Sequence, residues 1–309
     1  MSPGDERFLV TGALGCIGAW TCAILAASGA SVVGFDLGTD DRRLRLVGAA
    51  DVPVTRGDIT DRAALDRVLD DHAITHVIHL AALLIPQIKA SPPLGTAINV
   101  GGTVNVLDAA KSRNIRVAYA SSAAVYSQAD DHGGPVSNDA IGHPTTFYGV
   151  HKQACEGLAR IFWEEERVAS IGIRPFVVYG PGRDSGLTAS PSLAMAAAAR
   201  GEDSRIAFGG RTQLQFAPDA ARVFVAAARA AVEGARVFSL GGPAVAVVEA
   251  ARAIEALADV SCTVDEETQL PFPDEFDNGA LEDVIGPISW TPLEEGVRLT
   301  IDRLRVAPD

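Results

Sequence analysis

The order of segments along this chain predicts an α/β fold built on a doubly wound parallel sheet. From Arg7 to about Pro175, short β-branched runs alternate with alanine-rich helical runs, which is typical of a parallel sheet covered by helices on both faces. A glycine-rich turn follows the first predicted strand, where such sheets bind ligands. The 48% hydrophobic and 21% charged composition is that of an ordinary soluble globular protein.

Residues 1–180 are predicted to form the sheet, and residues 181–309 are predicted to form a smaller α/β lobe interleaved with it. The expected strands are Phe8–Thr11, Ser31–Phe35, Val52–Thr55, His76–Leu80, Val117–Ala120 and Ser170–Arg174. The expected helices are Cys16–Ser28, Arg62–Asp71, Leu94–Arg113 and Phe147–Arg167, with Asp61 and Thr146 as N-caps.

In the smaller lobe, glycine- and proline-containing loops separate the predicted elements. We expect helices near Ser192–Arg200, Asp219–Val232, Val247–Leu257 and Leu293–Arg305, and short strands at Arg205–Phe208 and Val237–Leu240. The acidic, proline-bearing run from Gln269 to Asp277 is interpreted as a surface loop. A lobe of this kind would complete a ligand-binding cleft.

Charge and cysteine content restrict the partners and the compartment. A formal net charge of −13 argues against nucleic-acid and anionic-membrane partners, because both need clustered lysine and arginine. The apolar runs are too short or too interrupted for a membrane helix, and no signal-peptide pattern precedes Phe8. The four cysteines show no C-x-x-C spacing and no Cys/His cluster. We therefore expect a cytoplasmic protein with reduced cysteines and no metal site.

The octapeptide T-G-A-L-G-C-I-G, between the first strand and the first helix, predicts a dinucleotide-binding turn. Gly12 would allow the tight turn, Gly15 would let backbone amides approach a pyrophosphate, and Gly18 would let the helix pack closely on the strand. The helix start at Cys16 and Ile17 would supply unpaired amides to the pyrophosphate. A plain strand-to-helix turn with incidental glycines is the alternative.

The end of the second strand predicts NAD rather than NADP as the cofactor. The Asp36 carboxylate would bind the adenosine ribose and repel a 2′-phosphate. Arg42 and Arg43 follow closely enough to keep NADP as an alternative, and Asp36 is otherwise a turn residue. After the third strand, Asp58 and its neighbour Ile59 are expected near the adenine edge, although an aspartate there often only begins a helix.

Further motifs follow in order along the first 180 residues, namely His79–Ala82, Asn99–Thr103, Ser121–Tyr126, Tyr148–Lys152 and Arg174–Gly182. Several are weak alone, but in this order and spacing they are specific. With the glycine turn and Asp58, they make the chain resemble the extended short-chain dehydrogenase/reductases, which include NAD-dependent sugar epimerases and dehydratases. The resemblance implies a homodimer through the 94–113 and 147–167 helices, and a nicotinamide lying near Leu80–Ala82 and Pro175–Val178. Of these, Leu80, Ala81, Ala82, Pro175 and Val177 are the expected cofactor-binding residues.

Tyr148, Lys152 and Ser122 are the expected catalytic residues. Moving a hydride from an alcohol carbon requires a base that takes the hydroxyl proton. A free tyrosine is protonated at neutral pH, and the Lys152 ammonium one helical turn from Tyr148 would favour the phenolate and could hold the nicotinamide ribose. Ser122 would donate to the substrate oxygen. The alternative is that tyrosine and lysine only decorate an exposed helix face.

Two other residues have weaker cases. Asn99 resembles the family's helix-borne asparagine, which orders the active-site backbone and a water, but an asparagine satisfying a helix bend explains it equally well. His79 is expected in the core, and for His151 a packing role is favoured over a catalytic one.

The substrate is less well defined than the cofactor. Family dehydratases carry an Asp-Glu pair where this chain has Ala123 and Ala124, which disfavours elimination of water. Arg211–Asp219 matches the nucleotide-sugar pattern of the family imperfectly, so a sugar, sugar acid or similar polyol is preferred. Substrate contacts are expected from the loops Leu83–Lys89, Ser127–Thr146 and Arg183–Thr188, with Leu84, Ser122, Ala123, Tyr148 and Arg183 as the main candidates.

Lys89 and Arg183 could each hold a carboxylate or a phosphate, or could be solvated surface charges.

The first functional hypothesis is a dehydrogenase or reductase that exchanges its hydride with free NAD. The second is an epimerase that retains NAD, oxidises its substrate and reduces the opposite face. A non-catalytic NAD sensor is a third possibility, and the intact serine, tyrosine and lysine argue against it.

Overall fold

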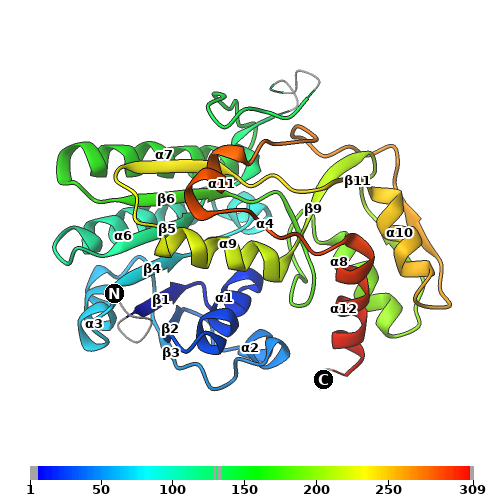
Figure 1. Cartoon of the computed structure of the whole chain (residues 1–309), viewed down its shortest axis with the longest axis horizontal. Helices are drawn as coiled ribbons and strands as arrows, with labels where there is room; N and C mark the ends of the chain where they lie inside the picture. The colour runs from blue at the N-terminus through cyan, green and yellow to red at the C-terminus, as the bar shows by residue number, and fades with distance from the viewer. Residues whose placement is uncertain (1–5, 128–129, 131–133, 307–309) are drawn as a thin grey trace.

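The computed structural model describes residues 6–127, 130 and 134–306, and its main layer is a seven-stranded parallel sheet (Figure 1). The strand order is β10-β6-β5-β4-β1-β2-β3, which contains the Rossmann order 3-2-1-4-5-6. All neighbouring strands pair in parallel. Their bounds are Arg7–Thr11 (β1), Ser31–Asp36 (β2), Val54–Arg56 (β3), His76–His79 (β4), Arg116–Ala120 (β5), Ser170–Arg174 (β6) and Ala235–Ser239 (β10). The doubly wound sheet predicted from the sequence is confirmed.

Alternate residues of the strands pack against two different helical layers. Phe8 and Val10 of β1 belong to a core cluster shared with α1 (Cys16–Ala27) and α9 (Ala217–Arg229), whereas Leu9 faces the opposite layer. This period of two follows from the pleat of a strand. The opposite layer consists of α3 (Arg62–Asp71), α6 (Gly102–Lys111) and α7 (Phe147–Glu166).

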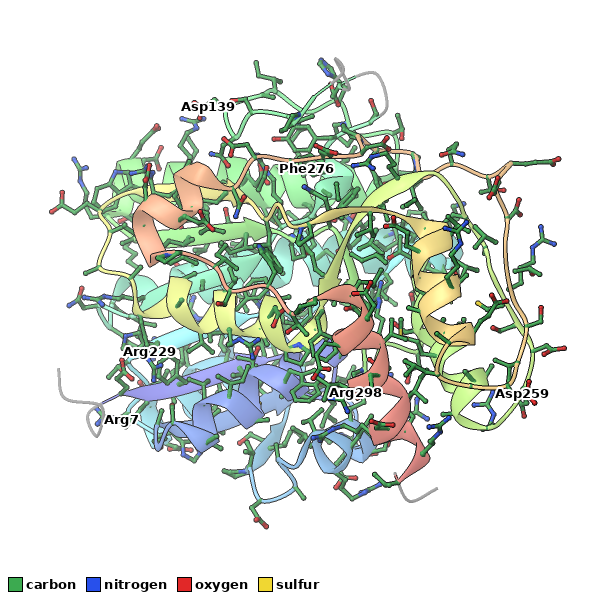
Figure 2. All side chains as sticks on the ribbon, turned by 45° about the vertical axis from the view of Figure 1, so that its right-hand side comes forward. Arg7, Asp139, Arg229, Asp259, Phe276 and Arg298 are labelled. Atoms are coloured by element: carbon green, nitrogen blue, oxygen red, sulfur yellow. The ribbon has the colours of Figure 1, made fainter. Side chains whose placement is uncertain are left out.

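The second half of the chain contributes to the main layer. Helix α9 packs beside α1, and β10 pairs with β6 at the sheet edge. The strand expected at 237–240 therefore lies in the large sheet and not in the smaller lobe, because the α9 crossover returns the chain to the sheet beside β6. Arg229, at the end of α9, lies near the start of β1 (Figure 2), where it pairs with Glu6 at 2.8 Å and covers the Phe8 ring.

A smaller lobe encloses a core of its own, which includes Met195, Phe208, Phe216 and Ile254. Its three-stranded sheet has the order β11-β9-β7, and a two-stranded sheet pairs β12 with β8. The strands are Val177–Tyr179 (β7), Ser204–Ile206 (β8), Arg211–Phe216 (β9), Ala244–Ala246 (β11) and Cys262–Val264 (β12), and the helices are Ser190–Ala199 (α8), Val247–Glu255 (α10) and Leu293–Arg305 (α12).

Some local predictions need correction. The helix expected over 94–113 is three consecutive segments, α5 (Pro92–Thr96), a π-helical segment (Ala97–Gly101) and α6, because the chain widens around Asn99. The run 269–277 is not simply a surface loop, since Leu270 and Phe276 are buried. Short elements that the pattern did not predict are α2 (Arg42–Val47), α4 (Ile85–Ala90), α11 (Gly279–Ile285) and a 3-10 turn (Ala123–Val125).

Both predicted N-caps are confirmed. Asp61 Oδ1 accepts a hydrogen bond from the Ala64 amide at 3.0 Å, and Thr146 Oγ1 accepts one from the Gly149 amide at 3.0 Å. Over the described ranges, no helix combines the length and the hydropathy that crossing a bilayer requires.

Candidate active site

A cavity of about 630 Å³ opens at the carboxyl ends of the central strands. Its walls come from the glycine turn, the ends of β2, β4 and β5, the start of α7 and the 182–188 loop. Parallel sheets of this order bind their ligands at that edge. The expected cofactor residues on its walls are Gly12, Gly15, Cys16, Ile17, Gly18, Asp36, Asp58, Ile59, Leu80, Ala81, Ala82, Tyr148, Lys152 and Pro175.

The glycine turn has the geometry that a pyrophosphate needs. Gly12 has a φ of +69°, and a Cβ at this residue would lie 2.7 Å from the Ala81 amide nitrogen. A Cβ on Gly18 would lie 2.1 Å from the Gly12 carbonyl oxygen, so α1 can approach the turn only without a side chain. Gly15 is the N-cap of α1, and because glycine has no side chain it provides no acceptor for the first amides of the helix. The first turn of α1 therefore offers its amides and its positive dipole end to an anion.

We expect Gly18→Ala to destabilise the protein by about 1–3 kcal/mol, because its methyl group would overpack the turn. The displaced turn should also bind NAD more weakly. Urea denaturation and calorimetric titration with NAD would measure both effects.

Gly157→Ala is a matched control for this substitution, because a Cβ at that position of α7 has open space within 4 Å. Helix propensity predicts a gain of about 1 kcal/mol for the control. Equal effects of the two substitutions would contradict a requirement for close packing at Gly18.

Asp36 lies where the adenosine ribose is expected. Its Oδ2 accepts a hydrogen bond from the Leu14 amide at 3.0 Å, and its Oδ1 accepts one from the Gly38 amide at 2.9 Å. On the neighbouring wall, Asp58 Oδ1 accepts hydrogen bonds from the amide and hydroxyl of Thr60, both at 2.8 Å. Both carboxylates are held in place by local turns and line the cavity.

Ser122, Tyr148 and Lys152 line one region of the cavity. Lys152 is buried, its Nζ donates to the Ala120 carbonyl oxygen at 2.6 Å, and it lies 5.6 Å from the centre of the Tyr148 ring. Ser122 Oγ accepts a hydrogen bond from the Ala124 amide at 3.1 Å. The structure thus brings the three expected catalytic side chains to one wall.

The close approach of α7 to this wall depends on Gly149, which the sequence reasoning did not single out. A Cβ on Gly149 would lie 2.0 Å from the Ala124 carbonyl oxygen. A residue without a side chain therefore lets the Tyr148 turn of the helix pack directly on the segment that follows Ser122. The signal in the sequence was the glycine beside the tyrosine.

A buried ion pair, also missed from the sequence, supports the same wall. Arg174 Nε and Nη2 each donate to a carboxylate oxygen of Glu156 at 2.8 Å, and both side chains are nearly buried. Glu156 Oε1 also accepts a hydrogen bond from Ser121 Oγ at 2.5 Å. Arg174 is the last residue of β6 and Ser121 directly follows β5, so these contacts join α7 to the ends of both strands. Glu156 lies one helical turn after Lys152 on α7.

Asn99 is buried in the π-helical segment and does not line the cavity. Its side-chain amide nitrogen donates to the Leu83 carbonyl oxygen at 3.0 Å, and its Oδ1 accepts from the Leu83 amide at 2.8 Å. It therefore fixes the backbone that leads to Leu84, which does line the cavity.

His79 lies in the core, as expected. Its Nδ1 is 2.7 Å from Thr11 Oγ1 and its Nε2 is 3.1 Å from Thr103 Oγ1. Burial, assisted by the Lys152 charge, lowers the pKa of His79 to about 3. His151 is also buried, with Nε2 3.1 Å from Thr96 Oγ1, and burial lowers its pKa.

The lowered pKa of His79 predicts a loss of stability in acid. Between pH about 3 and about 6.5, His79 is neutral in the folded protein and protonated in the unfolded chain. The unfolded chain then binds more protons, so the free energy of unfolding falls with decreasing pH, by up to about 1.4 kcal/mol per pH unit from this group. Urea denaturation of wild type and His79→Gln across this range would show a shallower dependence in the variant. His72→Gln, at an exposed position, should keep the wild-type slope.

The substrate side of the cavity includes several of the expected residues. Leu84, Ala123 and Arg183 line it, whereas Lys89 does not. Val177, which was expected beside the nicotinamide, does not line the cavity either. Of the expected loop 127–146, residues 128–129 and 131–133 lie outside the described residues, and its other residues do not line the cavity. Gln87 of the expected 83–89 loop also lines the cavity, and wall residues that the sequence did not suggest include Ile98 and Phe272.

Arg183 has unused hydrogen-bonding capacity in this cavity. Its Nη2 donates to Thr188 Oγ1 at 3.3 Å, but its Nε is buried and has no partner among the residues described. Leu84 and Gly186 lie beside the guanidinium. A partly buried guanidinium with a free donor can bind an anionic ligand group.

A parallel sheet of Rossmann order with a glycine turn at its carboxyl edge is typical of a dinucleotide-binding protein. Residues 8–241 match the model of the NAD dependent epimerase/dehydratase family, so the chain belongs to this family. Its cofactor is NAD, as expected from the glycine turn and Asp36.

The curated relatives that match this chain include several UDP-glucuronate 4-epimerases. UDP-glucuronate 4-epimerase 6 of Arabidopsis thaliana is 32% identical over 190 residues, covering 58% of this chain and 41% of that protein. The chain thus spans about two fifths of the length of the curated relatives it matches. The structure of MoeE5 in complex with UDP-glucuronic acid and NAD is 28% identical, with a TM-score of 0.79 over 97% of this chain and 99% of that one.

The fold is shared with enzymes of two activities. UDP-glucose 4-epimerase of Thermus thermophilus, in complex with NAD, has a TM-score of 0.84 at 23% identity over 98% of this chain and all of that one. The GalE-like L-threonine dehydrogenase from Cupriavidus necator has a TM-score of 0.87 at 23% identity over 97% and 100% of the two chains.

Proposed function

We propose that this protein transfers a hydride between NAD and a secondary alcohol or ketone carbon of a sugar acid or similar polyol. The observation that carries the proposal is the single cavity whose walls hold both the glycine turn and the side chains of Ser122, Tyr148 and Lys152. Residues 1–180 would bind the cofactor, and residues 181–309 would supply part of the substrate side.

Each of the three side chains has a defined task in the proposed reaction. NAD, when bound, accepts the hydride from the alcohol carbon or returns it to the ketone. In the oxidation, the Tyr148 oxygen takes the hydroxyl proton as the C–O bond becomes a carbonyl. Lys152 places its amino group near the Tyr148 ring, 5.6 Å from the ring centre, on the same helix face. Ser122 donates a hydrogen bond to the substrate oxygen and orients it.

Arg183 supports an acidic substrate. Its buried, unpartnered Nε faces no carboxylate of this chain among the described contacts, and a ligand carboxylate would fill that position. The UDP-glucuronate 4-epimerases, and MoeE5 in complex with UDP-glucuronic acid, are similar proteins whose names include a sugar that carries a carboxylate. We therefore place sugar acids ahead of neutral polyols.

The direct experiment is a screen for NADH formation, by its near-ultraviolet absorbance, with pairs of sugar acids and their neutral counterparts. The proposal expects NADH from at least one acid and weaker activity with its neutral counterpart. A protein that binds NAD but oxidises no polyol or sugar acid would contradict net oxidation.

The second candidate is an epimerase that retains its NAD. Two hydrogen bonds hold the 181–188 loop against the cofactor side of the cavity. Trp20 Nε1 donates to the Pro181 carbonyl oxygen at 3.0 Å, and Arg43 Nε donates to the Gly182 carbonyl oxygen at 3.0 Å. A loop held in this way would slow the release of NAD, which favours the epimerase. Cofactor that stays bound through gel filtration, with interconversion of two sugar epimers and no net NADH, would select the epimerase.

We also propose a cytoplasmic homodimer. Leu94 in α5 and Phe147 and Val150 in α7 are large apolar side chains that are about half exposed, on helices that contact each other. Burying them between two copies would remove apolar surface from water. All four cysteines are unpaired, in agreement with a reducing compartment. Light scattering that gives the mass of one chain would contradict the dimer.

A further inference from the structure

Arg43 lies near the carboxylate that is expected to bind the adenosine ribose, and Arg42 precedes it in the chain. Asp36 and Arg43 both line the cavity and both contact the peptide groups of Leu14. The Leu14 amide donates to Asp36 Oδ2 at 3.0 Å, and Arg43 Nη1 donates to the Leu14 carbonyl oxygen at 2.8 Å. An arginine at this place in a Rossmann sheet can accommodate the 2′-phosphate of NADP. The chain therefore carries basic groups suited to NADP beside a site for NAD.

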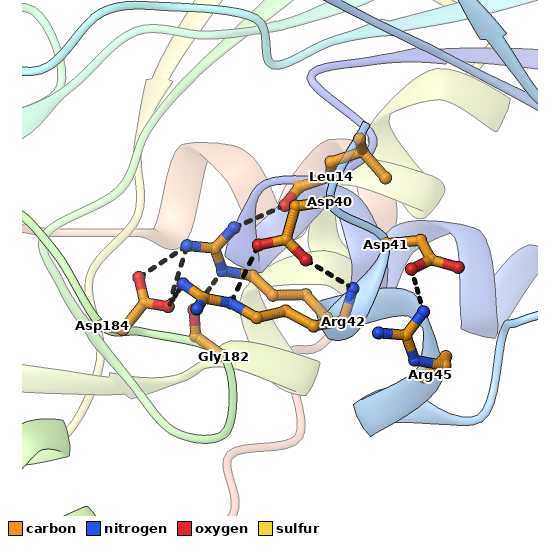
Figure 3. Close-up of polar contacts among 8 residues, drawn as sticks. Leu14, Asp40, Asp41, Arg42, Arg45, Gly182 and Asp184 are labelled. Carbon is orange, nitrogen blue, oxygen red and sulfur yellow. Dashed lines mark hydrogen bonds and ion pairs between the residues drawn. The ribbon is translucent and has the colours of Figure 1, made fainter. Parts of the chain in front are cut away.

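The acceptors of these arginines include one carboxylate from a distant loop (Figure 3). Arg43 Nη2 lies 2.6 and 2.9 Å from the two carboxylate oxygens of Asp184, and Arg42 Nη2 lies 2.9 Å from Asp184 Oδ2. Arg43 Nε donates to the Gly182 carbonyl oxygen at 3.0 Å. Every nitrogen of the Arg43 guanidinium thus has an acceptor within the protein.

The same contacts keep Asp184 charged. Burial raises the pKa of Asp184, but the hydrogen bond and charge of Arg43 and the charge of Arg42 outweigh it, so the pKa lies below its usual value. At neutral pH a 2′-phosphate would meet two carboxylates, Asp36 and Asp184, beside an Arg43 guanidinium whose nitrogens all have acceptors and an Arg42 that pairs with Asp40 and Asp184. Like charges at short range disfavour one another.

We propose that Asp184 determines the preference for NAD over NADP by engaging Arg42 and Arg43, which would otherwise bind a 2′-phosphate. The inference rests on dinucleotide binding in this cavity, as does the proposed function. It adds to Asp36 a second carboxylate, located 141 residues beyond Arg43 in the chain.

The test is calorimetric titration of the full chain with NAD⁺ and with NADP⁺. Asp184→Asn keeps the shape of the side chain and removes its charge. We expect its affinity for NADP⁺ to rise by about tenfold or more, the effect of hydrogen bonds from freed charged donors. Its affinity for NAD⁺ should stay within about threefold of wild type, because NAD⁺ has no 2′-phosphate for these donors.

Asp41→Asn is the matched control. Asp41 precedes α2 and pairs with Arg45 of that helix, away from Asp184 (Figure 3), and both aspartate side chains are partly exposed, 48% for Asp41 and 36% for Asp184. This variant should leave both affinities unchanged. In the Asp184→Asn background, replacing both Arg42 and Arg43 with alanine should remove the gain in NADP⁺ affinity.

The inference would be overturned if Asp184→Asn left the ratio of NADP⁺ to NAD⁺ affinity unchanged, or if the gain in NADP⁺ affinity persisted without the two arginines. A loss of NAD⁺ affinity in Asp184→Asn would also overturn it, because Asp184 would then only anchor the loop. Asp184→Ser provides the same comparison if the asparagine variant does not fold. Wild type that binds neither dinucleotide would remove the proposed function as well, whereas intact NAD⁺ binding with an unchanged ratio removes this inference alone.

Discussion

Tyr148→Phe is expected to lower kcat by about 10²- to 10⁴-fold, the range for loss of a general acid–base group. The substitution removes one oxygen and leaves the ring that lies near Lys152. Because the phenyl ring still fills its space on the cavity wall, NAD affinity and the free energy of unfolding should change little. Steady-state kinetics on the substrate found by the screen, with calorimetric titration of NAD, would measure these quantities.

Tyr119→Phe is the control for Tyr148→Phe. The Tyr119 hydroxyl is buried in β5 and has no hydrogen-bond partner in the part of the chain that the structure describes. Its removal tests the loss of a phenolic oxygen close to the site without touching the cavity wall, so kcat should remain near wild type. A Tyr148→Phe enzyme with full turnover would mean that another group removes the proton.

Glu156→Gln is expected to destabilise the folded protein by about 3–5 kcal/mol, the range for breaking a buried ion pair from one side. The variant would leave the Arg174 guanidinium, 10% exposed, without its counter-charge. It would also weaken the hydrogen bond from Ser121, next to Ser122. The loss should appear in urea denaturation at neutral pH, together with a lower kcat, since the wall that holds Lys152 and Ser122 is joined through this pair.

Glu164→Gln separates this effect from a general loss of charge on α7. Glu164 pairs with Arg160 on the same helix, but both side chains are at least half exposed. An exposed pair contributes about 1 kcal/mol or less, so this variant should be nearly as stable as wild type. Similar losses in the two variants would contradict a special role for the buried pair.

Much of the architecture was predictable because its signals are local. Alternation of strands and helices gave six strands of the large sheet, and Asp61 and Thr146 marked the starts of α3 and α7. Short strands such as β7 and β11 were missed, since three residues carry too little periodicity to be recognised. The placement of β10 was wrong because strand pairing is decided by neighbours in space.

The sequence by itself determined the glycine turn and the one-turn spacing of Tyr148 and Lys152 on α7. Both features involve residues that are close in the chain, where glycine conformations and helical spacing can be read directly. Only the tertiary structure decided which charges meet, as in Glu156 with Arg174 and Asp184 with Arg43. It also decided that Phe272 reaches the cavity from a run that was expected to be a surface loop. The physical reason is that ion pairing and burial depend on distances in space, and packing brings together side chains that no local pattern connects.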